Sequence, residues 1–531
     1  MSNLTTTSSK AASKSVGDPC AAYESLRTLW ERSRAVLNGE SQAKAYDDLI
    51  DVYTYKNLLL PFSPKMSQAQ YNFYRAEAEL PGLTSQYAKV LVGGLLRKNP
   101  LMSLPDSVPT EAHNWLEHHF SGDGISMLSF LDEAIWEELQ TSRAWIIVDY
   151  PEVNNYESLT SEQIAMINPY AMMVKAENVI NWRKAKAGVS NSEVLTSLVL
   201  RYYVADYSKN QFHPDYVDTV SHYFLDDSGM LQIDYYQRKD TNDTIGVVNG
   251  ELRSQYQQSL TTQDWALVDS KQPLMQGERM PFIPAFPLNG QVDPIEPALL
   301  PLVDREVALY NKVSRRNHLL YGAATYTPVV MSDMTDEQFE EITSAGLGAW
   351  IHLRKDDSIK ALETPTNSLS DMEKAISATV EEMAKMGIRM LSPEGGAQSG
   401  VALEIRNAAQ TAQLGLLNTK VSRTMQSVIT VMLNWKYGLG LKDEDVEYTL
   451  SADFNPTPMG ADWMRLITDW YQQGIIPRST FLAIAKQNDI LPIDYDDDEG
   501  KMEIQTDPLV GTNSSNIDAS ILENLNTDRQ A

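Results

Sequence analysis

The longest uninterrupted pattern in this chain belongs to a single helix. The stretch Val401–Tyr437 contains no proline, and its apolar residues recur every three or four positions, as along one buried side of a helix. At about 1.5 Å per residue this helix is roughly 55 Å long, longer than most helices of globular proteins. The chain must therefore contain a long rod as well as a compact body. The apolar stripe consists of Leu414, Leu417, Val421, Met425, Val428, Met432 and Trp435.

Two shorter helices precede this rod and enclose a small insert. The first is predicted over Asp293–Tyr321, starting at Asp293-Pro294, because proline is tolerated in the first turn of a helix but not deeper. The second is predicted over Ser368–Met386 and ends at Gly387. The insert, Gly322–Pro365, has short strand patterns around a short helix, so the two helices form a stalk with a tip. Leu391–Gly400, LSPEGGAQSG, is a loop before the rod.

The rest of the chain predicts a mixed α/β body and a small helical end. Residues 20–292 alternate helix and strand patterns, and Asp227-Ser228-Gly229 suits the turn of a hairpin. After Gly438 come a helix, a Gly-Ile-Ile-Pro turn and a second helix capped by Ser479 or Thr480. The fold class is therefore α+β and helix-rich. The body elements are helices over Ala21–Asn38, Thr84–Leu96 and Thr110–Thr141, broken at Ser121–Gly124, and strands over Ala144–Pro151 and between Ser192 and Asp240.

The charge balance is strongly acidic. There are 71 Asp and Glu residues against 44 Lys and Arg, a formal net charge of −27, so tight phosphate binding is not expected. The single cysteine, Cys20, excludes an intramolecular disulfide framework and fits a reducing compartment. No apolar run approaches the roughly 20 residues of a membrane span. Residues 1–19 are expected to form a disordered Ser/Thr-rich arm, and residues 491–531 an acidic, partly disordered tail.

The familiar signatures of catalysis are missing from the sequence. It contains no GxxxxGK[ST], GxSxG, HExxH or paired CxxC motif, and we expect neither an enzyme nor a cofactor. Three weaker patterns could each indicate a binding site, but for each we favour an ordinary structural role without a ligand. A nucleotide site could be formed by Gly395-Gly396 with Gly400, but we interpret this segment as a flexible loop. A zinc site could be formed by His113, Glu117, His118 and His119, but we interpret this group as a solvated helix surface. A calcium loop could begin at Asp494, Asp496 and Asp498, but we interpret these residues as a solvated acidic strip.

Two basic groups stand out in this acidic chain. Lys312, Arg315 and Arg316 cluster on the first stalk helix, and Arg354 and Lys355 lie in the insert. Each group could face DNA, because Lys and Arg neutralise phosphates. Ordinary ion pairing with neighbouring acids is the competing interpretation.

In its order of elements, the chain resembles the portal (head-to-tail connector) proteins of tailed double-stranded-DNA bacteriophages, and most closely a portal-like group that carries an uncharacterised-domain label. No single motif is specific, and the likeness lies in the succession of modules over residues 20–490. The segments that carry it are YRAEAELPGLTSQYAKVLVGGLLRKNP, ELQTSRAWIIVDYP, VINWRK, IPAFPLNG, DPIEPALLPLVDREVALYNKVSRRNHLLYGAATYTPVV and GIRMLSPEGGAQSGVALEIRNAAQTAQLGLL.

The resemblance implies a portal fold assembled as a ring of twelve copies at one capsid vertex. DNA would be packaged through the ring by the terminase motor and would later leave through it. The implied division is a disordered arm (1–19), wing (20–292), first stem helix (293–321), clip (322–366), second stem helix (367–390), tunnel loop (391–400), long helix continuing the wing (401–440), crown (441–490) and acidic tail (491–531).

The same resemblance implies partners and a place in the cell. The expected partners are other copies of the chain, duplex DNA in the channel, the major capsid protein, the terminase large subunit, head-tail adaptor or tail proteins, and a scaffold protein. The expected location is the virion, at the capsid vertex, and the host cytoplasm during assembly. No membrane is involved.

Three groups of residues follow as candidate functional positions. Twelve copies would carry 12 × 27 = 324 negative charges, so the tunnel loop is expected to be a low-friction collar rather than a clamp. The long helix has no evident partner within the chain, so a neighbouring subunit is expected to cover its stripe. The candidates are Arg389, Ser392, Glu394, Gly395, Gly396, Gln398 and Ser399 in and beside the tunnel loop; Lys312, Arg315 and Arg316 in the stem; and Arg354, Lys355, Glu337, Glu340 and Glu341 for docking at the clip.

Two other functions remain open. One is a different head-tail structural ring, such as an adaptor, against which the length and the helix–insert–helix order argue. The other is a metal-dependent hydrolase or nuclease that uses His113, His118 and His119.

Overall fold

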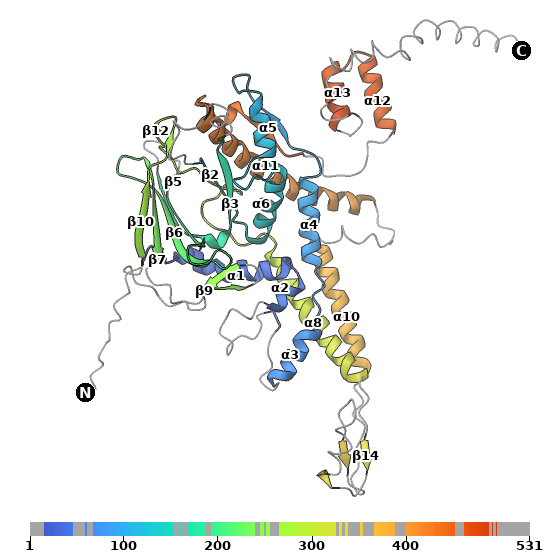
Figure 1. Cartoon of the computed structure of the whole chain (residues 1–531). Coiled ribbons are helices and arrows are strands. Elements are labelled where there is room, and N and C mark those ends of the chain that lie inside the picture. Colours follow the sequence, from blue (N-terminus) through green and yellow to red (C-terminus); the bar gives the residue numbers. More distant parts are fainter. Residues whose placement is uncertain are drawn as a thin grey trace, which may run out of the picture. The chain divides into compact units, whose positions relative to one another are not determined.

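The computed structural model divides the chain into two compact units, Met1–Ala452 and Asp453–Ala531. The first unit mixes helices with small sheets, and two helices are described in the second (Figure 1). Within the described residues, no helix is both long and apolar enough to cross a membrane. The structure describes residues 15–45, 59–60, 67–151, 160, 167–186, 193–238, 245–248, 251–254, 265–324, 329–331, 335–337, 351–353, 366–387, 400–451, 461–487, 491 and 495.

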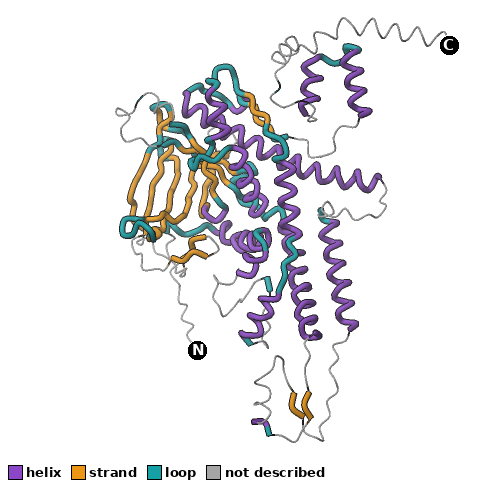
Figure 2. Tube along the Cα trace, turned by 45° about the vertical axis from the view of Figure 1, so that its right-hand side comes forward, coloured by secondary structure: helices purple, strands orange, loops and turns teal. Residues whose placement is uncertain are grey.

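The largest sheet has five antiparallel strands in the order β10-β7-β6-β5-β4 (Figure 2). Consecutive strands from β4 to β7 are neighbours, so this part is a meander, as the run of strand patterns predicts. The predicted hairpin turn between β6 and β7 is confirmed. Gly229 has a φ of 75°, and Asp226 Oδ1 accepts hydrogen bonds from the backbone N of Ser228 (2.8 Å) and Met230 (3.0 Å). The strands are β4 (Val179–Lys186), β5 (Glu193–Asp206), β6 (Asp215–Leu225), β7 (Leu231–Arg238) and β10 (Trp265–Lys271).

A second sheet, of order β13-β2-β3, lies at the centre of the body. Its middle strand β2 (Trp145–Asp149) is the predicted apolar strand, and its first four residues are buried. The flanking strands are β3 (Tyr170–Val174) and β13 (Ala285–Pro287). Two-stranded pairs are formed by β1 (Leu101–Ser103) with β16 (Glu447–Thr449), β8 (Ile245–Val248) with β9 (Glu251–Ser254), β11 (Leu274–Met275) with β12 (Glu278–Arg279), and β14 (Val329–Met331) with β15 (Ile351–Leu353).

Among the described helices of the body, α1, α4, α5 and α6 follow the predicted pattern, whereas α2 and α3 were not predicted. The predicted block over Thr110–Thr141 is two helices with a break at Ser121–Gly124, as expected. α1 packs Tyr23 and Trp30 against the five-stranded sheet, in a core with Val199, Val220 and Trp265. The helices are α1 (Ala21–Leu37), α2 (Glu40–Ala45), α3 (Gln68–Glu77), α4 (Leu83–Leu95), α5 (Glu111–His118) and α6 (Met127–Thr141), with short 3-10 turns η2 (Ala176–Asn178) and η5 (Asp443–Asp445).

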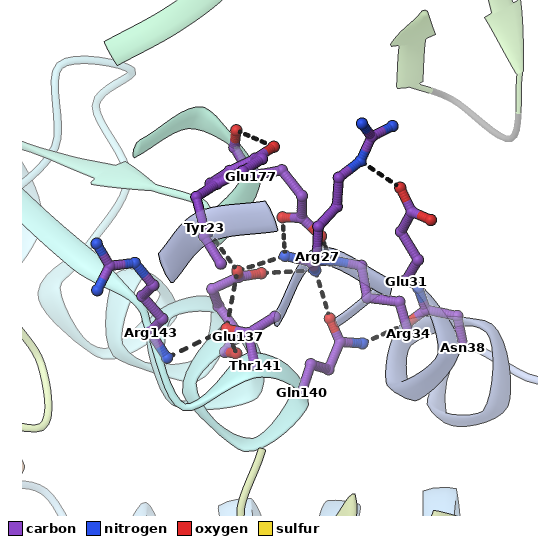
Figure 3. A network of polar contacts seen from close by, with 11 residues as sticks. Tyr23, Arg27, Glu31, Arg34, Asn38, Glu137, Gln140, Thr141, Arg143 and Glu177 are labelled. Carbon is purple, nitrogen blue, oxygen red and sulfur yellow. Dashed lines mark hydrogen bonds and ion pairs between the residues drawn. The ribbon is translucent and has the colours of Figure 1, made fainter. Parts of the chain in front are cut away.

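A buried ion cluster fastens α1 to α6 and η2 (Figure 3). Arg34 Nη1 donates to Glu137 Oε2 at 2.7 Å, Arg34 Nε donates to Glu177 Oε1 at 2.6 Å, and Arg34 Nη1 also donates to Gln140 Oε1 at 2.7 Å. Burial works to lower the pKa of Arg34, but the two carboxylates outweigh it and hold that pKa well above its ordinary value. The guanidinium is thus a fixed cation inside the body.

The three long helices are α8 (Leu300–Ala324), α10 (Thr366–Lys385) and α11 (Gly400–Tyr437). The spans predicted for α10 and α11 are confirmed to within two residues. Gly387, predicted to end α10, has a φ of 132°, which side chains other than glycine rarely adopt. The predicted start of α8 at Asp293-Pro294 is wrong, because the helix begins at Leu300. Asp293 instead accepts hydrogen bonds from Trp182 Nε1 (3.0 Å) and Lys184 Nζ (2.7 Å).

The expectation that a neighbouring subunit covers the stripe of α11 is also wrong for its described part. From Leu414 onward, all of these residues are buried within this chain except Leu417, which is half-buried. α11 packs against α4, β2, β13 and β16. Thr424 Oγ1 donates to a carbonyl at the end of β13, and Trp435 Nε1 donates to Leu274 O at 3.0 Å. The described part of the rod, from Leu414 onward, therefore belongs to the body of this chain.

The second unit contains α12 (Ala461–Gln472) and α13 (Arg478–Gln487), joined by the predicted Gly-Ile-Ile-Pro turn. The rings of Tyr471 and Phe481 stack with centroids 4.8 Å apart. The predicted cap of α13 is wrong: the helix begins at Arg478, directly after Pro477, so Ser479 and Thr480 lie inside its first turn.

Candidate functional site

The candidate site is the antiparallel pair of α8 and α10, which lie side by side in both views (Figures 1 and 2). Two polar contacts give the register. Arg305 Nη1 lies 3.5 Å from Glu382 Oε2, and Lys312 Nζ donates to Thr379 Oγ1 and to Ala375 O, the latter at 3.4 Å. Residue numbers rise along α8 as they fall along α10, so the helices run in opposite directions. This pair corresponds to the predicted stalk.

α10 turns a narrow apolar stripe inward and leaves most of its surface exposed. Leu369, Met372, Ile376, Thr379 and Met383 recur at spacings of three and four, the pattern of a helix that packs along one partner. Of residues 369–387, only Thr379 and Met383 are buried. α10 is therefore held mainly by α8.

α8, in contrast, is anchored deeply in the body. Val303, Val307 and Tyr310 belong to a core with residues of α1 and α3 and with Leu59 and Leu60. Between them, Glu306 is fully buried on the same helix. The body end of α8 is thus a structural element of the mixed α/β body.

Glu306 closes the N-terminus of α4 from across the chain. Its carboxylate accepts hydrogen bonds from the backbone N of Gly82 (2.8 Å), Leu83 (3.3 Å) and Thr84 (3.1 Å), and from Thr84 Oγ1 (3.2 Å). A helix N-terminus has unsatisfied N–H groups and a positive end of the helix dipole, so a carboxylate is stabilised there. Burial nevertheless raises the pKa of Glu306, and these hydrogen bonds only partly oppose the rise. The contact fixes α8 to α4.

The two helices of the pair carry opposite charge. α8 has four bases (Arg305, Lys312, Arg315, Arg316) and two acids (Asp304, Glu306), a formal charge of +2. α10 has four acids (Asp371, Glu373, Glu381, Glu382) and two bases (Lys374, Lys385), a formal charge of −2. The acidity of the chain as a whole is therefore interrupted along α8.

The three predicted stem bases have different surroundings. Lys312 is half-buried and turned to α10 by its bonds to Thr379 and Ala375. Arg315 is exposed and shares a hydrogen bond with Tyr74 of α3. Arg316 donates to the side-chain oxygen of its neighbour Asn317. In the described part of the chain none of the three forms an ion pair with an acid, so the ion pairing expected as the ordinary alternative is not found there.

Most other predicted site residues lie outside the described residues. Glu337 is helical and follows Thr335 and Asp336, and the strands β14 and β15 of the insert pair in parallel. The insert was expected to contain both strands. The residues outside are Arg389, Ser392, Glu394, Gly395, Gly396, Gln398 and Ser399 of the tunnel-loop group, and Arg354, Lys355, Glu340 and Glu341 of the clip group.

The histidine group extends from His113, in the first turn of α5, to His119, directly after the helix. His113 is half-buried, and Glu117, His118 and His119 are exposed. Among the residues that the structure describes, no three His, Cys, Asp or Glu side chains are grouped so that they could hold a metal ion.

Sequence reasoning missed Glu306, the polar residue that fixes the pair to the body. One signal was present: Glu306 lies within the buried face of α8, between Val303 and Tyr310, and a carboxylate at such a position needs buried donors. Its partners, Gly82–Thr84, lie more than 200 residues earlier, which no local pattern reveals.

Comparison with known protein families gives one match. A family described as a domain of unknown function (DUF4055) matches residues 298–436, from just before α8 almost to the end of α11. A comparison with curated proteins finds no match. The matched segment thus contains the helix pair, the insert and the long helix, which is the part of the chain that the sequence singled out.

Proposed function

We propose that this chain is the subunit of a phage portal, a ring at one capsid vertex through which duplex DNA is packaged and later released. The proposal is supported by the order of elements in residues 298–436. An anchored helix (α8), an insert with two short strands, an antiparallel return helix (α10) and a very long helix (α11) succeed one another. This is the order of stem, clip, stem and wing helix that the resemblance implies.

One observation carries the proposal furthest: α10 is a 20-residue helix with almost no contacts of its own to the body. Isolated helices are marginal in water, and most helical stability in proteins comes from packing. An exposed helix pair therefore gains stability if copies stand side by side. A rotationally related, head-to-tail contact that closes gives a ring.

Charge supports a channel for DNA rather than a DNA clamp. Twelve subunits at −27 carry 324 formal negative charges, which repel a polyanion and keep it from adhering to the wall. Bases such as Arg316 supply only weak, salt-sensitive contacts. In this proposal residues 20–292 and α11 face the capsid protein, and the insert docks the terminase and later the adaptor or tail.

The state of assembly of the purified full-length chain tests the proposal. Native mass spectrometry and negative-stain microscopy should show closed rings with a central hole, most of them with twelve copies. A stable monomer at high protein concentration would overturn the proposal. A ring of much smaller subunits is expected of an adaptor, so image dimensions separate the two kinds of head-tail ring.

A further inference from the structure

The α8–α10 pair has two flanks that face opposite ways. Asp304 forms an ion pair with Arg32 of α1 (2.8 Å), while Glu306, two residues on, binds the start of α4. Two residues turn a helix by about 200°, so α1 and α4 lie against opposite flanks of α8. We name them the α1 flank and the α4 flank.

Arg315 lies on the α1 flank. It follows Asp304 by 11 residues, which is about three helical turns, so both side chains leave α8 on the same side. Arg315 is exposed, and although it shares a hydrogen bond with the neutral hydroxyl of Tyr74 of α3, it has no acidic partner among the described residues. This flank therefore presents a cation without a counter-charge.

Glu373 lies on the α4 flank. It precedes Gly387 by 14 residues, about four turns, and a Cβ at Gly387 would meet the hydroxyl of Tyr87 of α4 at 3.0 Å. Glu373 is exposed and, in the described part of the chain, pairs with no base. This flank presents an anion without a counter-charge.

The two unpaired charges lie at the same height along the pair. The register that joins Arg305 to Glu382 and Lys312 to Ala375 and Thr379 places Arg315 level with residues 372–376 of α10. Glu373 is in the middle of that span. Copies related by rotation about an axis along the pair bring equal heights together, so Arg315 of one copy meets Glu373 of the next.

Apolar side chains complement each other in the same way. Val380, seven residues from Glu373 on the α4 flank, is 38% exposed. At its height on α8 lies Ala308, seven residues before Arg315 on the α1 flank, and Ala378 of α10 is exposed nearby. When the α4 flank of one copy meets the α1 flank of the next, the branched side chain of Val380 therefore faces small residues.

We propose that the α1 flank of one copy packs on the α4 flank of the next copy through an Arg315–Glu373 ion pair, with Val380 against Ala308 and Ala378. The inference rests on the proposed ring, and it assigns Arg315 to subunit contact rather than to DNA. The contact is heterologous, because each copy offers a different flank to each neighbour.

Paired charge reversals test this contact on the full-length chain. Arg315→Glu leaves both flanks acidic, and Glu373→Arg leaves both basic, so each variant alone should need at least a tenfold higher protein concentration to form rings. An equimolar mixture should recover ring formation, because acidic and basic copies can alternate. Alternation also requires an even number of subunits and a one-to-one composition, which native mass spectrometry of the two differently labelled variants measures.

Lys374→Glu is the matched control. It reverses a charge one residue from Glu373, but about 100° round the helix from the α4 flank, so rings should form as in the unchanged chain. Circular dichroism establishes that each variant is folded.

The outcomes separate the inference from the proposed function. If the unchanged chain forms no rings, the portal proposal fails. If the unchanged chain and Arg315→Glu form rings equally well, or if the mixture does not recover assembly, the flank pairing is wrong and the ring stands.

Discussion

Replacing Glu138 with glutamine should abolish a pH dependence of stability that the structure builds into the body. Glu138 lies on α6 and is buried, and its Oε2 accepts a hydrogen bond from the backbone N of Ala144 at 2.9 Å. Burial raises the pKa of its carboxyl from 4.5 to about 8, although Ala144 and Asn289 oppose the rise through hydrogen bonds. The folded chain therefore keeps a proton on Glu138 that the unfolded chain releases.

The sign and size of the effect follow from these two pKa values. The stabilisation is fully present below about pH 4.5 and is lost as the pH rises through about 8, because the unfolded state ionises first. Each pH unit between the two values lowers the free energy of unfolding by about 1.4 kcal/mol. Raising the pH from 6 to 8 should therefore cost the unchanged chain about 2 kcal/mol through Glu138 alone.

Urea unfolding followed by tryptophan fluorescence, at pH 6 and pH 8 and one protein concentration, measures this cost. Glu138→Gln retains an acceptor for Ala144, so it should match the unchanged chain to within about 1 kcal/mol at pH 6 and be the more stable at pH 8. Glu133→Gln on the exposed side of α6 is the control and should follow the unchanged chain. Equal pH dependence in the Glu138→Gln variant and the unchanged chain would refute the reasoning.

Three further substitutions probe other parts of the chain. Glu306→Ala leaves the N–H groups of half-buried Gly82 and Leu83 and of buried Thr84 without their acceptor. It should lower the free energy of unfolding by about 3 kcal/mol and speed hydrogen exchange of those amides. Unchanged exchange would contradict the capping role. Arg34→Met leaves the buried carboxylate of Glu137 and the half-buried carboxylate of Glu177 without their cation. It should lower the free energy of urea unfolding by about 3–5 kcal/mol, far more than the loss of an exposed ion pair would. Glu394→Lys would add a base to the proposed collar, so it should slow DNA movement in a packaging assay. Normal packaging would count against a low-friction channel.

Local sequence patterns were sufficient to predict the bounds of an element wherever its own residues determine where it begins and ends. The spans of α10 and α11 follow from a sustained apolar period and from breakers such as Gly387. The turn between β6 and β7 follows from Gly229 and from an aspartate that bonds its own loop. In these places the residues that begin, continue or end the element lie within that element or beside it, so its bounds can be predicted from the local sequence.

Long-range contacts account for what was mispredicted. Asp293 looked like a helix start, but its carboxylate is engaged by Trp182 and Lys184, more than 100 residues earlier. The stripe of α11 correctly indicated one buried side, but periodicity cannot say what covers it, and β2 and β13 of the same chain do so. For the site, the sequence predicted three of the four bases of α8, without Arg305. It could not predict their separate surroundings, which depend on Tyr74 of α3 and Thr379 of α10.

The positions of charge suggest how folding and assembly are separated in this chain. Buried charged side chains, such as Arg34 and Glu306, lie where α1 joins α6 and where α8 joins α4, and each has several hydrogen-bond partners. The unpaired charges of the helix pair, Arg315 and Glu373, are exposed instead. Loss of a buried charge leaves partners unsatisfied within one subunit and should destabilise even a single copy. Loss of an exposed one leaves the folded subunit unchanged, so it should be visible only when copies meet. Unfolding and ring formation should therefore respond to different substitutions, and a variant of the exposed flanks that unfolds the single subunit would break that division.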